Sequence, residues 1–422
     1  MENMAEKFGL KRYLALMGPG LLYAGAAIGV SHLVQSTRAG ADFGYELMWV
    51  LFAANLLKFP FFEIGSRYVL ATGKTLVDAY YNAGKWILAL FFIVSVLSMF
   101  PVQAALTMVT AGLLNYVFHS DMSAASMSTI LVVFTMFFFI AGRFQLLDKM
   151  MKIIILLLTL STIIAVVSAL GIPDHTTTET TPFDLFNKKH LLFLIAFIGW
   201  MPAPIDIVVW TSLWSQSKFQ DMKEKPDLRS VLIEFRIGFF GTMFIAAAFL
   251  ALGALVMHGT GQQLSPNGAL FAGQLIGMYT STIGSWAYPV IAIAAVSTML
   301  STTITVTDVY PRTLSKSVKL LFANNHFISK NLNYAFWIVV LSAGVVTLIW
   351  VSGTTMRLMV DFATSLSFIT APVLAYLNYR VIMSDAVADA FKPAPYLRIW
   401  SWIGIIFLSA FTLFYLYWLL FI

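Results

Sequence analysis

The sequence contains no cysteine, and only 11% of its 422 residues are charged. Without cysteine, the chain has no disulfide bonds, no thiolate metal ligands and no thiol nucleophile. A soluble domain carries about 25% charged residues, so the shortage of charge indicates a protein whose surface faces lipid. Hydrophobic residues make up 59% of the chain, and its mean hydropathy is +0.82. An ordinary soluble domain is therefore excluded.

The sequence also lacks the residue groupings that enzymes use. No nucleophile and base form a recognisable motif, and no phosphate-binding loop accompanies the apolar segments. We therefore expect neither an enzyme nor a bound cofactor. Basic residues beside membrane segments explain the formal charge of +6, so nucleic acid is not an expected partner. A membrane sensor or scaffold is disfavoured because no soluble domain is attached.

Apolar runs of roughly 20 residues recur along the chain, which is the pattern of membrane-spanning helices. We place eleven of them, near residues 15–37, 45–70, 86–118, 123–142, 148–171, 190–214, 232–257, 283–306, 332–352, 358–380 and 397–421. No soluble domain fits between these runs. Residues 1–422 are therefore predicted to form a single all-α domain embedded in the lipid bilayer.

Lysine and arginine are unevenly distributed among the segments that join these runs. If the N-terminus is cytoplasmic, most of them fall on the cytoplasmic side, and chiefly Lys188, Lys189 and Arg357 remain outside. Membrane proteins retain their basic residues on the cytoplasmic side in this way. We predict a multi-pass protein of the inner (plasma) membrane with a cytoplasmic N-terminus and an outside C-terminus.

Two of the runs are interrupted in their middle. In the first run, the stretch 18–32 contains several glycines together with Ser31 and His32, and in the sixth the stretch 199–206 contains two prolines. Proline removes a backbone donor and clashes with the preceding turn, so the helix opens there. Unwound backbone in a membrane is tolerated only where protein buries it or where it lines a cavity. Either break alone could be a kink, but the pair favours a binding site.

The two interruptions are five helices apart. This spacing is typical of transporters built from two inverted five-helix repeats, which hold their substrate between broken helices near the middle of the membrane. Because five is odd, the second repeat begins on the opposite side of the membrane. We predict a first repeat at 15–171, a second, inverted repeat at 190–380 and an additional helix at 397–421.

Several stretches resemble the Nramp transporters of divalent metal ions. The matching stretches are Gly18 to Leu22, Ala39 to Tyr45, Arg67 with Ala71 to Lys74, Gly142-Arg143 to Lys149, Met201-Pro202 and Ser301 to Thr305. The resemblance covers nearly the whole chain. It implies an all-α, LeuT-like 5+5 inverted-repeat fold with discontinuous helices 1 and 6, secondary transport by alternating access, and a monomer.

The residues that bind metal in that family are not retained. Where the family has Asp-Pro-Gly-Asn in helix 1, this chain has Gly29-Val30-Ser31-His32, and where it has Met-Pro-His in helix 6, this chain has Met201-Pro202-Ala203. Ser367 stands at a family glutamine of helix 10. Two acidic residues of helix 3 that the family ties to proton movement fall at Gln103 and Leu106. The resemblance thus implies the scaffold without its metal site.

The residues left at the two breaks suit an anion better than a metal ion. Hard cations need carboxylate and carbonyl oxygens, whereas softer cations accept imidazole or thioether. Each helix N-terminus at a break carries roughly half a positive charge, and glycine at position 29 leaves that field unopposed. We predict a small anion as the substrate, with bicarbonate first and chloride, nitrate or a small carboxylate as competitors. The predicted substrate-binding residues are Gly29, Ser31, His32, Met201, Ala203 and Ser367.

A divalent metal transporter with an altered site is the alternative hypothesis. In that case His32 and Met201 would hold Mn²⁺, Fe²⁺ or Mg²⁺ together with backbone carbonyls near Ala26 and Ile198. One imidazole and one thioether suit a soft ion and would bind it weakly, but they would not suit Mg²⁺ or Ca²⁺.

An anion that enters an inside-negative cell needs a driving ion. The hydroxyls of Ser301, Thr302 and Thr305 on helix 8, with carbonyls near Ala26, resemble the sodium site of LeuT-like carriers. Asp206, one turn past the second break, is a further candidate as a cation ligand or proton acceptor. Hydroxyls that bond back to their own helix are the alternative explanation. We predict coupling to Na⁺, with H⁺ as the other possibility.

Three further charged residues lie close to these helices. Lys58 and Glu63 are expected to extend toward the membrane surface or to form gate contacts rather than to bind substrate. Arg38, at the outer end of helix 1, is expected either to attract anions or to contact lipid headgroups.

Overall fold

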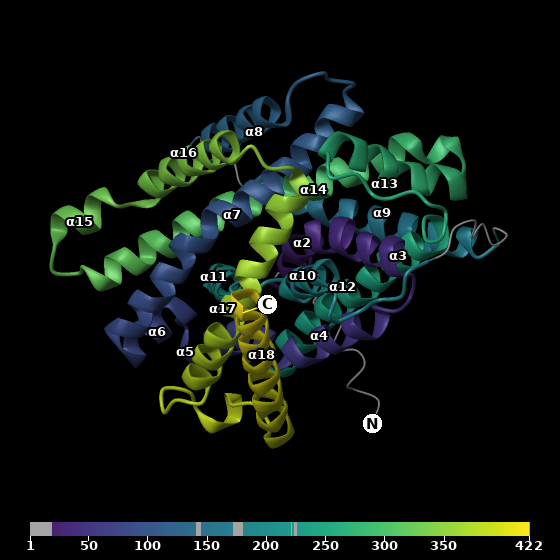
Figure 1. Cartoon of the computed structure of the whole chain (residues 1–422). Helices are drawn as coiled ribbons and strands as arrows, with labels where there is room; N and C mark the ends of the chain where they lie inside the picture. Colours follow the sequence, from purple (N-terminus) through teal and green to yellow (C-terminus); the bar gives the residue numbers. More distant parts are fainter. Residues whose placement is uncertain (1–18, 141–144, 172–179, 221, 223–225, 422) are drawn as a thin grey trace, which may run out of the picture.

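The computed structural model describes residues 19–140, 145–171, 180–220, 222 and 226–421. Within these ranges the regular structure is helical (Figure 1). The first half contains α2 (Pro19–Ala27), η2 (Ser31–Ser36), α3 (Thr37–Phe43), α4 (Met48–Phe62), α5 (Ile64–Thr72), α6 (Leu76–Ala83), α7 (Lys85–Val117), α8 (Ala124–Ile140) and α9 (Gln145–Ala169). The second half contains α10 (Lys188–Trp200), α11 (Ile207–Gln220), α12 (Leu228–Val256), α13 (Gly268–Ile283), η3 (Ser285–Ala287), α14 (Tyr288–Leu321), α15 (His326–Asn331), α16 (Tyr334–Ser352), α17 (Met356–Ile382), η4 (Asp389–Phe391) and α18 (Pro395–Phe421).

Seven helical segments of the described residues are long and apolar enough to cross a membrane, with lengths from 19 to 37 residues. Of the other four predicted runs, the first and sixth are divided into short pieces, the fourth forms the 17-residue α8 and the fifth forms the 25-residue α9. Residues 15–18 of the first run lie outside the described residues. The multi-pass architecture is confirmed, and the total of eleven stays a prediction.

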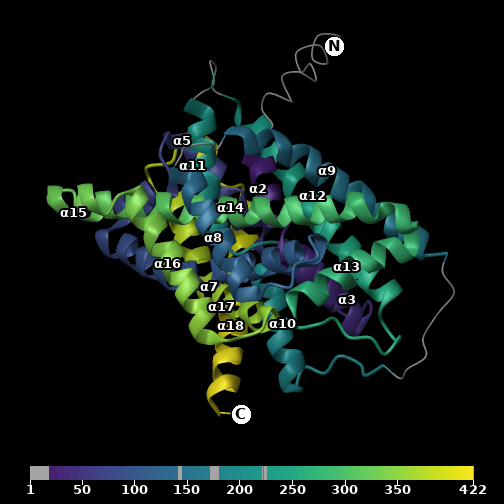
Figure 2. The same cartoon turned by 90° about the horizontal axis from the view of Figure 1, so that it is seen from above.

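Helix α14 lies at the centre of the arrangement. It crosses the molecule from α15 at one end to η3 at the other (Figure 2), and it packs against α7, α9 and α16. In the same view the end of α18 and the start of α10 lie at one edge, and α5 and α11 lie at the opposite edge. These edges correspond to the predicted outer and cytoplasmic faces.

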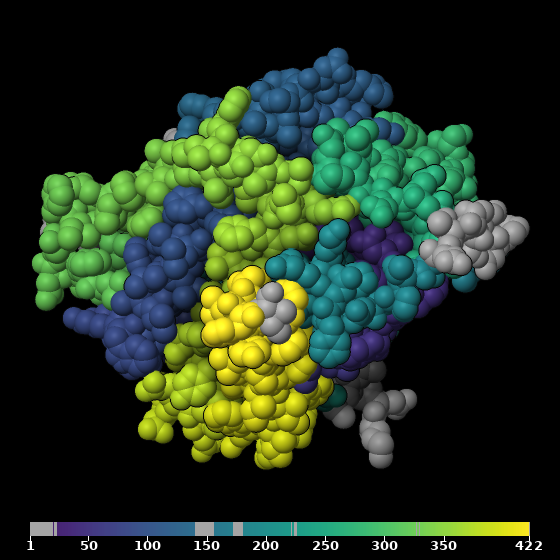
Figure 3. All heavy atoms as spheres, in the orientation of Figure 1, coloured from purple at the N-terminus to yellow at the C-terminus, as the bar shows by residue number. Residues whose placement is uncertain are grey.

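In the space-filling view, helices of the second half form much of the visible face, and blue areas of the first half lie at its left and upper parts (Figure 3). Only small areas of the purple N-terminal helices reach this face. The contact between α3 and α12 is especially close, because a Cβ atom at Gly40 would lie 1.9 Å from the carbonyl oxygen of Leu250. Backbone-to-backbone packing therefore fixes α3, the second part of helix 1, against α12.

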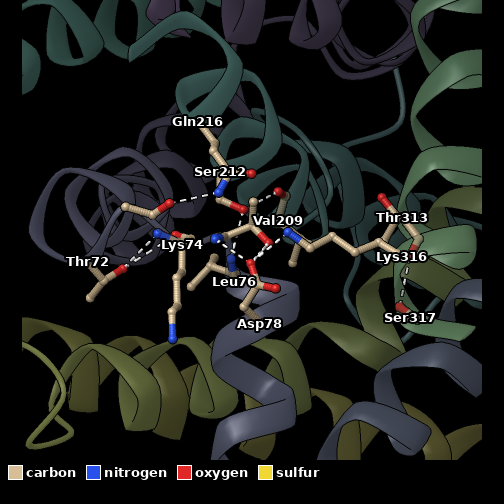
Figure 4. A network of polar contacts seen from close by, with 12 residues as sticks. Thr72, Lys74, Leu76, Asp78, Val209, Ser212, Gln216, Thr313, Lys316 and Ser317 are labelled. Carbon is tan, nitrogen blue, oxygen red and sulfur yellow. Dashed lines mark hydrogen bonds and ion pairs between the residues drawn. The ribbon is translucent and has the colours of Figure 1, made fainter. Parts of the chain in front are cut away.

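A polar network joins three elements at the predicted cytoplasmic face (Figure 4). The Asp78 carboxylate lies 2.6 Å from the Lys316 ammonium of α14 and accepts a 2.8 Å hydrogen bond from the Thr75 amide. The amide of Leu76 donates to the Ser212 hydroxyl of α11 at 3.0 Å, and Gln216 donates to the carbonyl of Gly73 at 2.8 Å. The segment between α5 and α6 is thereby fastened to α11 and α14.

Candidate substrate site

Both predicted interruptions are present. After α2 ends at Ala27, residues 28 and 29 bend, and the chain continues as the wider π-helix η2. The amides of His32 and Leu33 both donate to the carbonyl of Gly29, at 3.1 and 2.9 Å. The second interruption separates α10 from α11 over residues 201–206, where two prolines cannot donate backbone hydrogen bonds. The sequence therefore sets where each helix opens.

A small cavity of about 30 Å³ lies between the two interruptions. Its wall is formed by Ala26, Ala27, Val30, Ser31, Val102, Leu106, Trp200, Ala203, Pro204, Ile207, Trp210, Thr302 and Val306. A water molecule needs about 10–15 Å³ by this kind of measure, so this conformation admits a solute of only a few atoms. The cavity lies between helix 1 (α2 and η2), helix 3 (α7), helix 6 (α10 and α11) and helix 8 (α14). This is the expected place for a substrate site between two broken helices.

Four of the predicted residues lie on the cavity wall. Ser31 and Ala203 come from the two interruptions, Ala26 from the end of α2, and Thr302 from α14. The Ser31 hydroxyl lies 2.8 Å from the carbonyl oxygen of Ala27. The structure thus brings together one predicted substrate hydroxyl and one predicted coupling-ion hydroxyl.

His32 lies outside the cavity wall. Its ring is fully buried, and Nε2 lies 3.0 Å from the carbonyl oxygen of Thr242 on α12. A carbonyl can only accept, so Nε2 donates to Thr242, and Nδ1 lies 2.7 Å from the Ser31 hydroxyl. Both ring nitrogens therefore have protein partners. His32 connects helix 1 to α12 in this conformation and presents no free nitrogen to a substrate.

Gly29, Met201 and Ser367 are also absent from the wall. A Cβ atom at Gly29 would lie 3.0 Å from the Thr302 hydroxyl, so the glycine permits close contact between helix 1 and α14. Met201 is fully buried. The Ser367 hydroxyl accepts a 2.8 Å hydrogen bond from the indole of Trp200, which does line the cavity. Ser367 therefore positions a wall residue instead of forming the wall.

The predicted coupling-ion residues are divided between two places. The Thr302 hydroxyl lies 3.3 Å from the carbonyl oxygens of both Gly25 and Ile28, beside the break in helix 1. Ser301 and Thr305 are buried on the same helix but are not wall residues. Asp206 is buried past the second break, where Tyr310 donates to its carboxylate at 3.2 Å. Asp206 is therefore separate from the Thr302 cluster.

Lys58 does not extend toward the membrane surface, and a gate contact stays a prediction. Its side chain is only 1% exposed, and its ammonium donates to the carbonyls of Ile198 and Gly199 at 2.5 and 3.0 Å. These carbonyls end α10 directly before Trp200, so a positive charge sits at the negative end of that helix. Glu63 does make the expected kind of polar contact, with Arg67 at 2.9 Å and Arg236 at 2.5 Å.

Sequence spacing concealed the position of Lys58. Lys58 and Glu63 are five residues apart and do not share a helix face, so no local partner indicated where the ammonium goes. The available signal was a lysine in the middle of an apolar run, which is costly unless its charge is satisfied inside the protein. The partner proved to lie 140 residues away.

The ligand set of a metal site is absent from the part of the chain that the structure describes. No group of three or more histidine, cysteine, aspartate or glutamate side chains converges there. The cavity wall itself contains no carboxylate, imidazole or thioether. Hydroxyls, indoles and backbone groups are the polar atoms that this wall can offer.

Comparison with known proteins identifies the scaffold. The family model for natural resistance-associated macrophage protein-like (Nramp) sequences matches residues 20–418. The chain belongs to the Nramp family. A protein of Pasteurella multocida that is named only as uncharacterized is 35% identical to this Nramp chain over 420 residues, covering 99% of it and 95% of the relative.

Two further relatives have names that state a function. The divalent metal cation transporter MntH of Klebsiella pneumoniae is 36% identical over 78 residues, which cover 18% of this chain and 19% of that protein. A crystal structure of a mutant of the Eremococcus coleocola manganese transporter matches with a TM-score of 0.72 at 15% identity, covering 96% of this chain and 87% of the other. The predicted all-α, LeuT-like fold is confirmed. The chain is an Nramp-family membrane transporter and not an enzyme.

Proposed function

We propose that this Nramp-family member is a secondary transporter of a small anion, with bicarbonate as the first candidate, driven by Na⁺. The observation that supports this proposal is the ammonium of Lys58 on the carbonyls of Ile198 and Gly199. Ile198 is one of the carbonyls that the metal hypothesis needs as a ligand. A built-in cation already occupies it.

The charge of Lys58 opposes a divalent ion at this place. A metal bound to the Ile198 carbonyl at about 2.0–2.6 Å would lie at most about 5 Å from the ammonium, which is 2.5 Å from the same oxygen. At an effective dielectric constant of 20, the repulsion between charges of +2 and +1 at that separation is about 7 kcal/mol. A carboxylate would offset this term, but the cavity wall has none. The same charge attracts an anion.

The cavity wall also offers hydrogen-bond donors. Trp210 lines it, and its indole N–H is a hydrogen-bond donor. Ser31 lies beside the start of η2, with its hydroxyl proton directed to the Ala27 carbonyl, and Ile207 marks the start of α11 on the same wall. The positive end of the helix that begins at η2 adjoins the cavity, which favours an anion, whereas the Asp206 carboxylate already accepts from the first amide of α11. Bicarbonate has few atoms and accepts such hydrogen bonds.

Thr302 supports the choice of Na⁺ as the driving ion. Its hydroxyl is surrounded by carbonyl oxygens of Gly25, Ile28 and Thr298 at 3.3, 3.3 and 3.1 Å. Na⁺ prefers hard oxygen ligands of this type, and unwound backbone carbonyls supply them in related folds. We propose that Na⁺ binds here between helix 1 and α14, with Ser301 close by on the same helix. Asp206 remains a candidate proton acceptor.

A divalent metal is the second candidate substrate. The names of the Klebsiella and Eremococcus relatives favour it. His32 and Met201 would have to turn toward the cavity to serve as ligands, because neither lies on its wall here.

Transport by the full chain in liposomes separates the two substrates. Labelled bicarbonate at alkaline pH, where little CO₂ forms, should enter saturably and faster with an inward Na⁺ gradient than without one. Radioactive Na⁺ uptake should in turn require bicarbonate. Protein-free liposomes measure the leak. Saturable Mn²⁺ entry without bicarbonate entry would overturn the anion proposal, and bicarbonate entry that ignores Na⁺ would overturn only the coupling.

We further propose a monomer in the plasma membrane with a cytoplasmic N-terminus and an outside C-terminus. The natural absence of cysteine allows single-cysteine labelling on an otherwise silent background. An impermeant maleimide should label Lys188→Cys in intact cells and should label Lys74→Cys only after lysis. The reverse pattern would invert the topology.

A further inference from the structure

A larger cavity opens at the predicted outer face, about 510 Å³ in volume, and we name it the outer pocket. It lies between the end of α3, the start of α10, the segment 257–263 and the start of α17. In Figure 2, α3 and the start of α10 lie toward the edge where α18 ends. The outer pocket is thus separate from the central cavity.

Three basic side chains from three helices line the outer pocket. They are Arg38 of α3, Lys189 of α10 and Arg357 of α17. Asp42 is the only acidic residue among the described lining residues. The wall therefore has an excess of positive charge, although the sequence predicts this face to be poor in basic residues.

Protein contacts hold the two arginines in place. Arg38 is 6% exposed, its Nη1 lies 2.7 Å from Asp361, and its guanidinium lies 4.7 Å from the ring centre of Phe193. This burial rules out the lipid-headgroup alternative for Arg38. Arg357 donates from Nη2 to the carbonyl of Leu264. In both arginines Nε is buried and has no hydrogen-bond partner in the part of the chain that the structure describes, so neither guanidinium is saturated. Fixed guanidinium groups with free donors are suited to oxyanions.

Asp42 adds a feature that an unselective anion site would lack. Its carboxylate has no hydrogen-bond partner among the described residues, although it lies on the wall with Arg38 and Arg357. A carboxylate repels an anion unless the anion donates a proton to it in a hydrogen bond. Bicarbonate has such a hydroxyl, whereas nitrate has the same trigonal shape without one. Asp42 therefore favours a protonated oxyanion over its unprotonated counterpart.

The outer pocket is coupled to the central cavity through a single helical segment. Arg38 donates to the side-chain oxygen of Gln35 at 3.2 Å, and Gln35 donates to Asp361 at 3.2 Å. Gln35 lies on η2, which begins with the cavity residue Ser31. Seven residues separate Ser31 from Arg38, which is about 10 Å along a helix. An anion in the outer pocket would be one short step from the cavity.

We propose that the outer pocket is a binding site for a small oxyanion with a hydroxyl proton, held by Arg38, Arg357 and Lys189 and selected by Asp42. This proposal rests on the proposed anion transport for the identity of the ligand. The outer pocket would be a first binding site, which selects the substrate before the substrate reaches the central cavity.

Two neighbouring lysines provide a matched test. Lys189 lines the outer pocket, whereas Lys188 lies over the ring of Trp418 at 5.5 Å and does not line it. In liposomes, Lys189→Gln should raise the KM for bicarbonate about fivefold and leave kcat within twofold, and Lys188→Gln should behave as the unmodified chain does. Arg357→Gln should raise the KM by about tenfold. An unchanged KM in both pocket variants, or equal effects of the two lysines, would overturn the proposal while leaving the transport function intact.

Titration of the full chain in detergent with bicarbonate and nitrate tests selectivity without transport. We expect bicarbonate to bind about tenfold more tightly than nitrate, and Asp42→Asn to reduce this ratio to within threefold. If liposomes take up no bicarbonate, the proposed function fails, and this titration alone decides the outer pocket. Binding that Lys189→Gln weakens and Lys188→Gln does not would then support the pocket. Absence of binding, or binding that ignores both Lys189 and Asp42, would refute it.

Discussion

Replacing Lys58 with methionine is the most direct test of the charge selectivity. Methionine retains an unbranched side chain of similar length but removes the ammonium from the carbonyls of Ile198 and Gly199. The ammonium is 3.0 Å from the Gly199 oxygen, and the next residue, Trp200, lines the cavity. One residue adds about 4 Å, which puts the charge about 7 to 8 Å from a bound anion. At an effective dielectric constant of 20, this attraction is about 2 kcal/mol.

The loss of about 2 kcal/mol corresponds to roughly 30-fold weaker anion binding. We therefore expect Lys58→Met to raise the KM for bicarbonate by about that factor in liposomes. Titration with Mn²⁺ should at the same time reveal binding that the unmodified chain lacks, because the repulsion is gone and two carbonyls are free. Lys58→Arg keeps the charge and is the matched control, with an expected KM within about threefold of the unmodified value.

Two results would refute this reasoning. One is a Lys58→Met protein that transports bicarbonate with an unchanged KM, since the ammonium would then contribute nothing to selectivity. The other is equal loss of transport in Lys58→Met and Lys58→Arg, which would indicate a packing requirement instead of a charge requirement. Elution volume and thermal midpoint of each purified variant establish that it is folded before transport is compared.

Three further predictions concern the coupling ion, the cytoplasmic network and helix packing. Thr302→Val should remove the Na⁺ dependence of bicarbonate uptake without preventing bicarbonate binding. Thr305 does not line the cavity, so Thr305→Val should leave the Na⁺ dependence intact. The opposite pattern would contradict the Na⁺ site at Thr302. Burial raises the pKa of Asp78, but hydrogen bonds from Lys316 and Thr75 have the larger effect and hold this pKa below its usual value. The ionised carboxylate therefore stabilises the folded state above about pH 4, and this stabilisation is lost as the pH falls below that value. Asp78→Asn should therefore lower the thermal midpoint at pH 7, and this difference from the unmodified chain should shrink near pH 3; a constant difference would contradict the assignment. Gly40→Ala should lower the free energy of unfolding by several kcal/mol or prevent folding, because the new Cβ would lie 1.9 Å from the carbonyl oxygen of Leu250. Gly277→Ala is the control, because no atom lies within 4 Å of its Cβ. In thermal unfolding it should be neutral or stabilising by up to about 1 kcal/mol.

The sequence was most informative about local backbone chemistry. Pro202 and Pro204 predict an opening of the sixth run, and α10 does end at Trp200, two residues before Pro202. The glycines and polar residues of the first run predict a second opening, which lies between α2 and η2. These predictions hold because a missing backbone donor or a missing side chain acts within one helical turn, whatever packs around it.

The direction of each side chain was harder to predict. Ser31 and His32 are adjacent, yet Ser31 lines the cavity while His32 bonds to Thr242 of α12. The wider turn of η2 determines which of the two faces the cavity, and that turn depends on packing against α12. Likewise, Ser367 contacts the wall residue Trp200 instead of the cavity. These side-chain orientations depend on tertiary packing, so they could not be predicted from the single sequence.

The sequence by itself determined that the chain is a membrane-embedded helical protein with two matched helix breaks and no acidic residue at position 29. Length, apolar composition and proline chemistry act locally, so they can be read from the chain directly. Only the tertiary structure decided which charges face the substrate path. Lys58 reaches carbonyls 140 residues away, and Arg38, Lys189 and Arg357 meet from three helices. Charges separated along the chain act together because the fold brings them within a few ångströms of one another, in an interior where water screens them weakly.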